Sequence, residues 1–164
     1  MKIALLGYGK MGKAIEEIAL NRGHSVVFKT NEASMEKDVS KADVAIDFST
    51  PETAVDNIKK CFAVNVPVVV GTTGWYEGFS EVCRLCELGG HSLFHATNFS
   101  VGVNIFFEVN KKLAKLMDTQ ADYEIEMTEI HHTQKLDSPS GTAITLAEGI
   151  VGELAGNKLN KIPA

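Results

Sequence analysis

Long apolar runs are missing from this sequence of 164 residues. No stretch approaches the roughly 18 consecutive apolar residues of a membrane-spanning helix, so we expect no membrane span and no membrane partner. Gly7, Gly9 and Gly12 interrupt the apolar N-terminal run, which argues against a secretion signal. Internal repeats and low-complexity stretches are missing too. Hydrophobic residues make up 45% of the sequence, which is ordinary for a globular domain.

Positive charge is in deficit, since 16 Lys and Arg residues face 21 Asp and Glu residues and give a net charge of −5. This balance argues against a nucleic-acid partner, and any bound anion must be held by local donors. Cysteine is also scarce, with three residues. An odd count without a secretion signal predicts reduced thiols in the cytoplasm.

Two of the three cysteines, Cys83 and Cys86, form a CxxC pair inside a stretch of helical spacing. A structural zinc site would need a second ligand pair at a matching spacing, and the sequence shows none. We therefore interpret the thiols as buried and inert and predict no metal site. A metal or redox role is the alternative.

Over the first hundred residues, short apolar runs alternate with stretches of helical spacing. The predicted strands are Lys2–Leu6, Ser25–Phe28, Val44–Phe48, Pro67–Val70 and Ser92–His95, and the predicted helices are Lys10–Arg22, Glu52–Phe62 and Tyr76–Leu88. Such an alternation indicates a parallel sheet of βαβ units, and nearly continuous apolar strands fit a sheet covered on both faces. Residues 1–100 therefore predict an α/β fold with a Rossmann-like parallel sheet.

The pattern changes after residue 100. Val101–Met117 and Thr142–Leu154 have helical spacing, and Tyr123–Ile130 alternates as a half-exposed strand does. One strand is not a sheet, because its backbone groups need ladder partners. We expect these partners from a neighbouring chain or from a chain that continues past Ala164, and we favour the second. Residues 101–164 thus predict part of an α+β domain.

A glycine motif, GxGxxG, lies between the first predicted strand and the first predicted helix, at residues 7–12. In that context the first glycine permits a tight turn, the second lets a pyrophosphate approach the backbone, and the third lets the helix pack on the strand. Free N–H groups at the helix N-terminus then face the phosphates. The motif predicts a dinucleotide site; a plain glycine turn is the alternative.

The end of the second predicted strand bears on the choice between NAD and NADP. An acid there favours NAD, and a cation favours the 2′-phosphate of NADP. The sequence is mixed: Glu32 lies 20 residues after Gly12, Asn31 stands beside it, and Lys29 either reaches a phosphate or is solvated. The prediction is therefore NADH or NADPH.

Three more polar loops follow predicted strands, at residues 47–50, 71–74 and 96–100. The carboxyl ends of strands in an open α/β sheet are where ligands bind. Each loop alone is more often a simple polar turn. Together, beside a glycine motif, they favour a ligand site.

The segment from His131 to Thr142 holds two histidines and Lys135, and it ends where a helix is predicted to begin. Ser140 is a suitable N-cap, and the free N–H groups of the next two residues can bind an anion. Lysine and histidine can also move protons at neutral pH. The segment predicts a carboxylate or phosphate site with acid–base groups; a chance polar loop is the alternative.

Five motifs stand in a characteristic order and spacing: GYGKMG, VAIDFSTP, VVVGTTGW, ATNFSVGVN and EIHHTQKLDSPSGTA. They resemble the dihydrodipicolinate reductase family, NAD(P)H-dependent enzymes of the diaminopimelate and lysine pathway. The resemblance covers essentially the whole chain and implies that residues 101–164 are part of an α+β substrate and oligomerisation domain. The glycine motif is shared with many dehydrogenases, whereas the HHxxK segment is close to family-specific. Family members are longer, which agrees with the lone predicted strand.

The resemblance also implies roles for individual residues. His131 matches the acid–base histidine, His132 a substrate contact, and Lys135 the proton-donating lysine. Gly141 and Thr142 match the pair that holds a substrate carboxylate. The implied cofactor contacts are Gly7, Tyr8, Gly9, Lys10, Met11, Gly12, Gly71, Thr72, Thr73, Ala96, Thr97, Asn98 and Phe99.

The resemblance implies an oxidoreductase that transfers a hydride from NADH or NADPH to C4 of a cyclic dicarboxylate, 4-hydroxy-tetrahydrodipicolinate or dihydrodipicolinate. The product would be tetrahydrodipicolinate, and the resemblance implies a cytoplasmic homotetramer. Another Rossmann dehydrogenase of amino-acid metabolism would explain the first hundred residues equally well, but not the HHxxK segment. The remaining alternatives are a non-catalytic NAD(P)-binding sensor module and an inactive fragment of a reductase.

Overall fold

The computed structural model describes residues 1–30, 39–131 and 138–155. The chain forms two compact units, Met1–Ala96 and Thr97–Ala164. The sequence predicted a boundary after residue 100, which is four residues beyond the boundary observed after Ala96. None of the helices in the described ranges is both long and apolar enough to cross a membrane.

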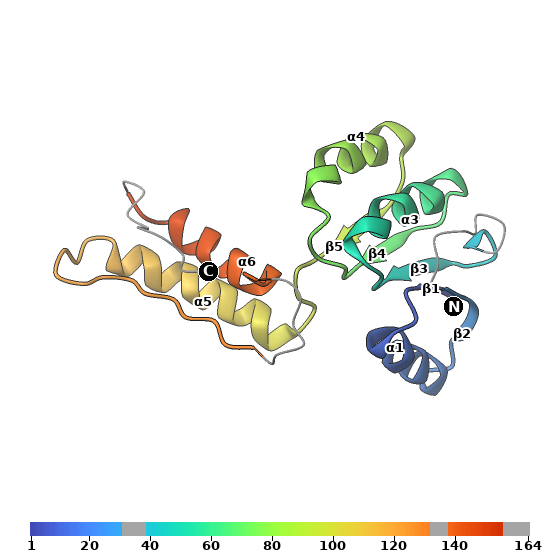
Figure 1. Ribbon diagram of the computed structural model, residues 1–164, viewed down its shortest axis with the longest axis horizontal. Helices are drawn as coiled ribbons and strands as arrows, with labels where there is room; N and C mark the ends of the chain where they lie inside the picture. Colours follow the sequence, from blue (N-terminus) through green and yellow to red (C-terminus); the bar gives the residue numbers. More distant parts are fainter. Residues whose placement is uncertain (31–38, 132–137, 156–164) are drawn as a thin grey trace. The chain divides into compact units, whose positions relative to one another are not determined.

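Unit 1 is built on a five-stranded sheet (Figure 1). Its strands are β1 (Lys2–Leu6), β2 (Ser25–Thr30), β3 (Val44–Asp47), β4 (Val68–Val70) and β5 (Leu93–His95). They lie in the order β2-β1-β3-β4-β5, and every neighbouring pair is parallel. The predicted α/β fold with a parallel sheet is therefore confirmed.

Helices cover both faces of this sheet, which explains why the inner strand β1 is apolar and buried from Ile3 to Leu6. Ile3 and Leu5 of β1 pack with Ala19 of α1 (Lys10–Asn21) on one face. On the other face, Ala4 and Leu6 belong to a larger core with α3 (Pro51–Ala63) and α4 (Phe79–Gly89). Figure 1 shows α1 on one side of the sheet and α3 and α4 on the other.

The ends of the helices follow local sequence signals. Thr50 is the N-cap of α3 and Pro51 its first residue, where proline's missing N–H costs no helix hydrogen bond. The predicted helix from Tyr76 begins instead as a short 3₁₀ helix, η1 (Tyr76–Gly78), before α4. Gly90 ends α4 in the left-handed conformation, with φ of 62°. Lys59 on α3 forms an ion pair with Glu81 on α4 at 2.9 Å.

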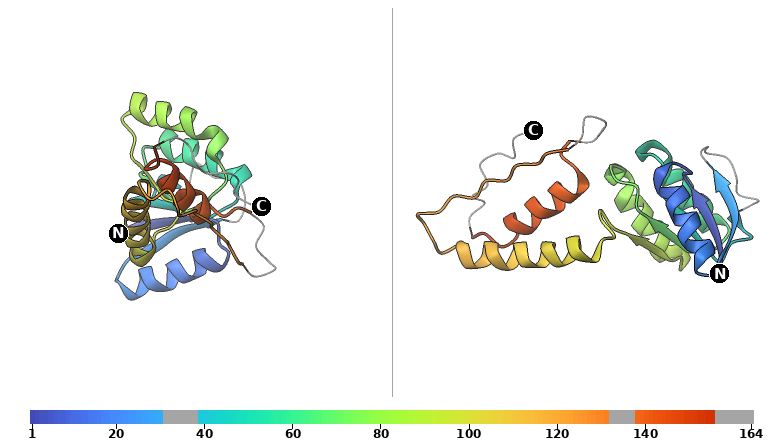
Figure 2. Two further views of the ribbon diagram at one scale, coloured as in Figure 1. Left: turned by 90° about the vertical axis from the view of Figure 1, so that its left-hand side faces the viewer. Right: turned by 90° about the horizontal axis from the view of Figure 1, so that it is seen from below.

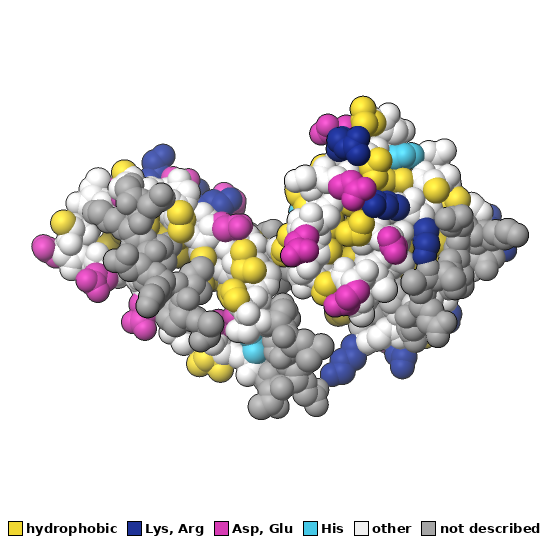
Figure 3. All heavy atoms as spheres, turned by 45° about the horizontal axis from the view of Figure 1, so that its top comes forward, with side chains coloured by type: hydrophobic (Ala, Val, Ile, Leu, Met, Phe, Trp, Pro, Cys, Tyr) yellow, Lys and Arg dark blue, Asp and Glu magenta, His cyan; other side chains and the backbone are white. Residues whose placement is uncertain are grey.

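Lysine, arginine and acidic side chains are interspersed on the surface of unit 1 (Figure 3).

The cysteines divide into two environments. Cys61 of α3 is fully buried, and burial, followed by the nearby Asp47 carboxylate, raises the pKa of its thiol to about 12. Cys83 and Cys86 are only half-buried, because α4 faces the sheet with one side and leaves its flanks toward solvent. The prediction of buried thiols was therefore wrong for this pair. All three thiols are free, and the Cys86 thiol donates to the His91 carbonyl at 3.2 Å.

Unit 2 contains two packed helices, α5 (Val101–Met117) and α6 (Gly141–Val151). The Asn110 amide on α5 donates to the Leu146 carbonyl on α6 at 3.0 Å. The small core between them consists of Phe107, Ala114, Ala143, Ala147 and Ile150. A second apolar stripe of α5 is exposed and consists of Val101, Ile105, Phe106, Val109, Leu113 and Leu116.

The strand predicted at Tyr123–Ile130 is not formed. Figures 1 and 2 show this segment as an extended chain beside α5, without strand assignment. A strand is defined by its ladder hydrogen bonds, and the described residues of unit 2 provide no second strand. On the alternating side, Met127 and Glu129 are half-buried whereas Tyr123 and Ile125 are exposed, so the pattern does not by itself specify a partner.

Candidate functional site

The glycine motif forms a tight turn between β1 and α1. Gly7 has φ of +90°, and a Cβ at this residue would lie 2.2 Å from the Phe48 carbonyl oxygen. The Gly7 N–H donates to the Thr30 carbonyl at 2.7 Å. At Gly12, a Cβ would lie 2.3 Å from the Gly7 carbonyl oxygen. The backbone of this turn therefore packs too closely for side chains at its first and third glycines.

Gly9 differs from these two glycines. It is the N-cap of α1, and a Cβ there would meet no atom of the described part of the chain within 4 Å. Lys10 and Met11, in the first turn of α1, are exposed beside it. Open space at the N-terminus of a helix, bounded by a glycine backbone, fits the pyrophosphate of a dinucleotide.

This contrast makes Gly9 a clean test of the cofactor site. We expect Gly9→Val to fold normally and to weaken NAD(P)H binding at least tenfold, about 1.4 kcal/mol, because its side chain would occupy the space of the phosphates. Gly9→Ala should give a smaller loss. Calorimetric titration measures the affinities, and circular dichroism checks the fold. Unchanged affinity in folded Gly9→Val would remove the pyrophosphate from this turn.

A buried hydrogen-bond network joins the loops that follow β3 and β4. The Asp47 carboxylate, at the end of β3, is fully buried. One of its oxygens accepts from the Thr72 hydroxyl at 2.5 Å and from the Ser49 hydroxyl at 2.8 Å and amide at 3.1 Å. The other oxygen accepts from the Asn57 side chain on α3 at 2.8 Å. Four donors on three segments thus converge on one carboxylate, which holds both loops in place.

Thr72 contributes to this region in a way that the sequence did not predict. Its hydroxyl donates to Asp47 and accepts from the Ser49 N–H at 2.9 Å, while its carbonyl accepts from Trp75 at 2.9 Å. The Thr72 side chain is therefore engaged within the protein. The neighbouring Gly71 lies against the Phe48 ring, where a Cβ would come within 2.2 Å, and Thr73 is half-buried.

Lys29, at the end of β2, belongs to a cluster with two residues from the first βα unit. Its ammonium pairs with Glu16 at 2.9 Å and lies 4.7 Å from the centroid of the Tyr8 ring. The hydrogen bond with Glu16 raises the pKa of Lys29, and hydrogen bonds from Tyr8 and Lys29 lower the pKa of Glu16. Asn31 and Glu32 lie outside the described residues.

The predicted cofactor segment 96–99 crosses the boundary between the units. Ala96 ends unit 1, while Thr97, Asn98 and Phe99 open unit 2. The hydroxyl of Thr97 lies 2.9 Å from that of Thr145, and the Asn98 amide donates to the Thr142 hydroxyl at 3.3 Å. Within unit 2, a predicted cofactor contact therefore meets a predicted substrate contact.

The N-terminus of α6 holds the other described site residues. Ser140 is the N-cap, as predicted, and its hydroxyl accepts from the Ala143 N–H at 3.1 Å. Gly141 and Thr142 follow it, and the first amides of a helix have no partner within the helix. His131 is exposed, and its Nε2 lies 2.5 Å from the Glu129 carboxylate. His132 and Lys135 lie outside the described residues.

The sequence motifs did not reveal Asn57 or the contacts of Glu129. The one signal for Asn57 was an amide on the face of α3 that also carries Ile58 and Cys61, where a polar side chain needs a partner. Glu129 offered only its place two residues before His131.

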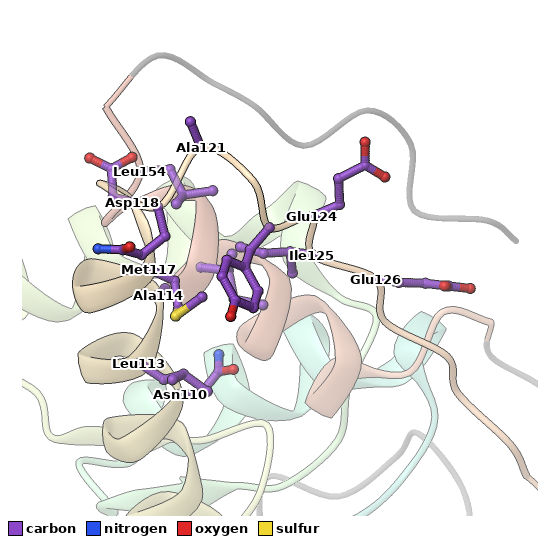
Figure 4. A pocket seen from close by; sticks show the side chains of 13 residues that line it. Asn110, Leu113, Ala114, Met117, Asp118, Ala121, Glu124, Ile125, Glu126 and Leu154 are labelled. Atoms are coloured by element: carbon purple, nitrogen blue, oxygen red, sulfur yellow. The ribbon is translucent and has the colours of Figure 1, made fainter.

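A pocket of about 780 Å³ lies elsewhere in unit 2, between the ends of α5 and α6 and the extended segment (Figure 4). The described residues that line it include Met117, Tyr123 and Leu154, and none of them is a predicted site residue. We do not assign this pocket to the site.

Comparison with known proteins agrees with this geometry. The family model described as "Dihydrodipicolinate reductase, N-terminus" matches residues 1–99, and "Dihydrodipicolinate reductase, C-terminus" matches residues 102–163. A 4-hydroxy-tetrahydrodipicolinate reductase of Christiangramia forsetii is 52% identical over 153 residues, which cover 92% of this chain and 64% of that protein. One from Methanobrevibacter smithii is 44% identical over 116 residues, 70% of this chain and 41% of that protein.

A solved structure is also similar. The dipicolinate-bound dihydrodipicolinate reductase from Paenisporosarcina sp. TG-14 matches with a TM-score of 0.71 and 26% identity, covering 98% of this chain and 69% of that one. The chain spans less than two thirds of the length of the two curated relatives described above. Because two family models together cover nearly all its residues, the chain belongs to the dihydrodipicolinate reductase family.

Proposed function

We propose that this protein is an NAD(P)H-dependent 4-hydroxy-tetrahydrodipicolinate reductase of lysine (diaminopimelate) biosynthesis. The observation that carries the proposal is the hydrogen bond from Asn98 to Thr142. It joins a residue expected to contact the cofactor to one expected to hold a substrate carboxylate. Hydride transfer requires this proximity, because the reacting carbons of cofactor and substrate must touch.

Unit 1 supplies a cradle that fits a nicotinamide dinucleotide. Gly7 and Gly12 shape the turn, Gly9 leaves open space at the N-terminus of α1, and Asp47 fixes the two neighbouring loops. The contacts expected from this unit are the residues of the glycine motif, Gly71, Thr73 and Ala96, with Thr72 acting through loop shape. The bound cofactor would supply the hydride.

Unit 2 supplies the groups for the substrate, a cyclic dicarboxylate. In this proposal the N–H groups of Gly141 and Thr142 and the Thr142 hydroxyl bind one carboxylate at the N-terminus of α6. His132 contacts the substrate, Lys135 donates a proton to the carbon next to C4, and His131 acts as acid or base. The relative from Paenisporosarcina supports a dicarboxylate, since its structure holds dipicolinate.

Cofactor choice depends on the end of β2. Because the Lys29 ammonium lies at the end of β2, where it can pair with a 2′-phosphate, and Asn31 carries no charge that would repel one, we expect NADPH to be used at least as well as NADH. Lys29→Ala should weaken NADPH binding about tenfold and NADH binding little, a difference of about 1.4 kcal/mol. Fluorescence titration with both cofactors measures this, and Lys13→Ala, exposed on α1, is the control. Equal losses for both cofactors would remove Lys29 from the ribose pocket.

A coupled assay tests the proposed activity. The preceding synthase makes the substrate in place, and the loss of NADH or NADPH absorbance reports the reduction. Turnover supports the proposal. Binding of NAD(P)H without turnover would favour a sensor module, and turnover only with another amino-acid-derived substrate would favour a different dehydrogenase.

A homotetramer and a cytoplasmic location remain predictions from the resemblance. Light scattering measures the oligomeric state.

A further inference from the structure

Glu129 joins the acid–base histidine to the N-terminus of α6. One oxygen of its carboxylate lies 2.5 Å from Nε2 of His131. The other accepts the backbone N–H of Ser140 at 3.0 Å. The Glu129 side chain is 23% exposed and that of His131 is 39% exposed, so the bridge is partly shielded from solvent.

We propose that Glu129 is a positioning residue that holds His131 in its Nε2–H tautomer, so that Nδ1 is the ring atom that accepts and returns the proton. This inference rests on the proposed function, in which His131 is the acid–base group. It adds the atom of the ring that reacts and the residue that selects it.

The charge state of Glu129 supports this assignment. Hydrogen bonds from Ser140 and then from His131 lower the pKa of Glu129 to about 2. The carboxylate is therefore ionised at neutral pH and can only accept hydrogen bonds. The ring nitrogen facing it must carry a proton. A neutral imidazole has a single N–H, so its lone pair is on Nδ1.

The Ser140 contact fixes where that carboxylate can lie. Ser140 is the buried N-cap of α6, and its hydroxyl oxygen accepts from the Ala143 N–H, so that the hydroxyl proton can donate to Glu129 beside the backbone N–H. A carboxylate held by the backbone of a helix cap has little freedom to follow a rotating histidine ring. The ring therefore keeps a constant orientation relative to Gly141 and Thr142, the predicted substrate contacts.

A single substitution can reverse the tautomer. In Glu129→Gln, only one side-chain atom can accept a hydrogen bond, and the Ser140 N–H, which can only donate, needs it. The amide NH₂ then faces Nε2 of His131, which must become the acceptor. The neutral ring is thereby shifted to its Nδ1–H form, and the atom proposed to accept the proton is blocked.

Nitrogen-15 NMR of the histidine rings, at a pH where the imidazole is neutral, tests this directly. His131→Asn identifies the signal of His131. We expect Nε2–H in the natural protein, Nδ1–H in Glu129→Gln, and a mixture in Glu129→Ala. Glu124→Gln, an exposed glutamate on the same extended segment, is the control and should leave the signal unchanged.

Kinetics provide the second measurement. We expect Glu129→Gln to lower kcat by roughly 10²–10⁴-fold, as a wrong histidine tautomer does in a serine protease, with unchanged NAD(P)H affinity. An Nδ1–H ring in the natural protein, or Glu129→Gln with natural kcat, would overturn the proposal. If the tautomer reverses but the natural protein has no reductase activity, the proton-transfer role fails with the proposed function, while the tautomer control by Glu129 stands.

Discussion

Lys135→Ala is expected to lower kcat by at least about 100-fold, since general acid catalysis contributes roughly 10²–10⁴-fold to a reaction rate. The resemblance assigns Lys135 a proton-donor role, while its place four residues after His131 also suits an anion contact. A residue that only binds a carboxylate would raise KM and spare kcat. We expect both parameters to change, because one ammonium can bind the carboxylate and donate the proton.

Steady-state kinetics with both parameters separated decide between these roles. Lys112→Ala, an exposed lysine on α5, is the matched control and should leave both parameters unchanged. NAD(P)H affinity should survive Lys135→Ala, because the glycine motif belongs to the other unit. Natural kcat in Lys135→Ala would reduce the residue to a binding contact, and loss of NAD(P)H binding would mean that the residue serves the cofactor.

Asp47→Ala is the second change with a large expected effect. It would leave the donors of Ser49, Asn57 and Thr72 without their shared acceptor inside the core. We expect the free energy of unfolding to fall by about 3 kcal/mol, because hydrogen bonds to a buried charge contribute more than neutral ones. NAD(P)H affinity should fall about tenfold or more in the folded protein, because the loops after β3 and β4 lose their common anchor.

Urea denaturation and cofactor titration measure the two effects separately. Asp43→Ala is a control at the other end of β3, where the carboxylate accepts from the Lys2 N–H at 2.7 Å in an exposed setting; we expect a loss under about 1 kcal/mol and unchanged affinity. Thr72→Ser should retain binding that Thr72→Val loses. A destabilised Asp47→Ala protein with natural affinity would limit the network to a role in stability.

Local patterns were sufficient for most elements of the fold. β1 and α5 have the bounds that were predicted: β1 is a continuous apolar run that ends at Gly7, and α5 has helical spacing that begins after its N-cap, Ser100. The strand predicted at Tyr123–Ile130 is not formed, because alternation does not supply the ladder partner that a strand needs and the described residues of unit 2 contain none. The start of α4 was wrong by a few residues, as is usual where a helix begins with a 3₁₀ turn.

The site was less predictable than the fold. The glycine motif and the N-cap Ser140 are local features, so the sequence was enough to find them. Asp47 and Thr72 are 25 residues apart, and Glu129 and Ser140 are 11 apart. Contacts at such separations depend on how the elements pack, which periodicity does not encode. Asn57 could be noticed as a polar residue on an apolar face, but its partner could not.

The order of strands in the sheet also has a consequence for how the chain folds. β1 pairs with β2 and β3, so Ile3 lies opposite Val26 and Val44, and every neighbouring pair of the described sheet is parallel and therefore not joined by a short hairpin. Such distant parallel pairs form slowly, because loops must close before any contact is gained. Until β3 has been synthesised, β1 has a free edge and an uncovered apolar surface. During this interval the emerging chain is most exposed to aggregation and to capture by chaperones.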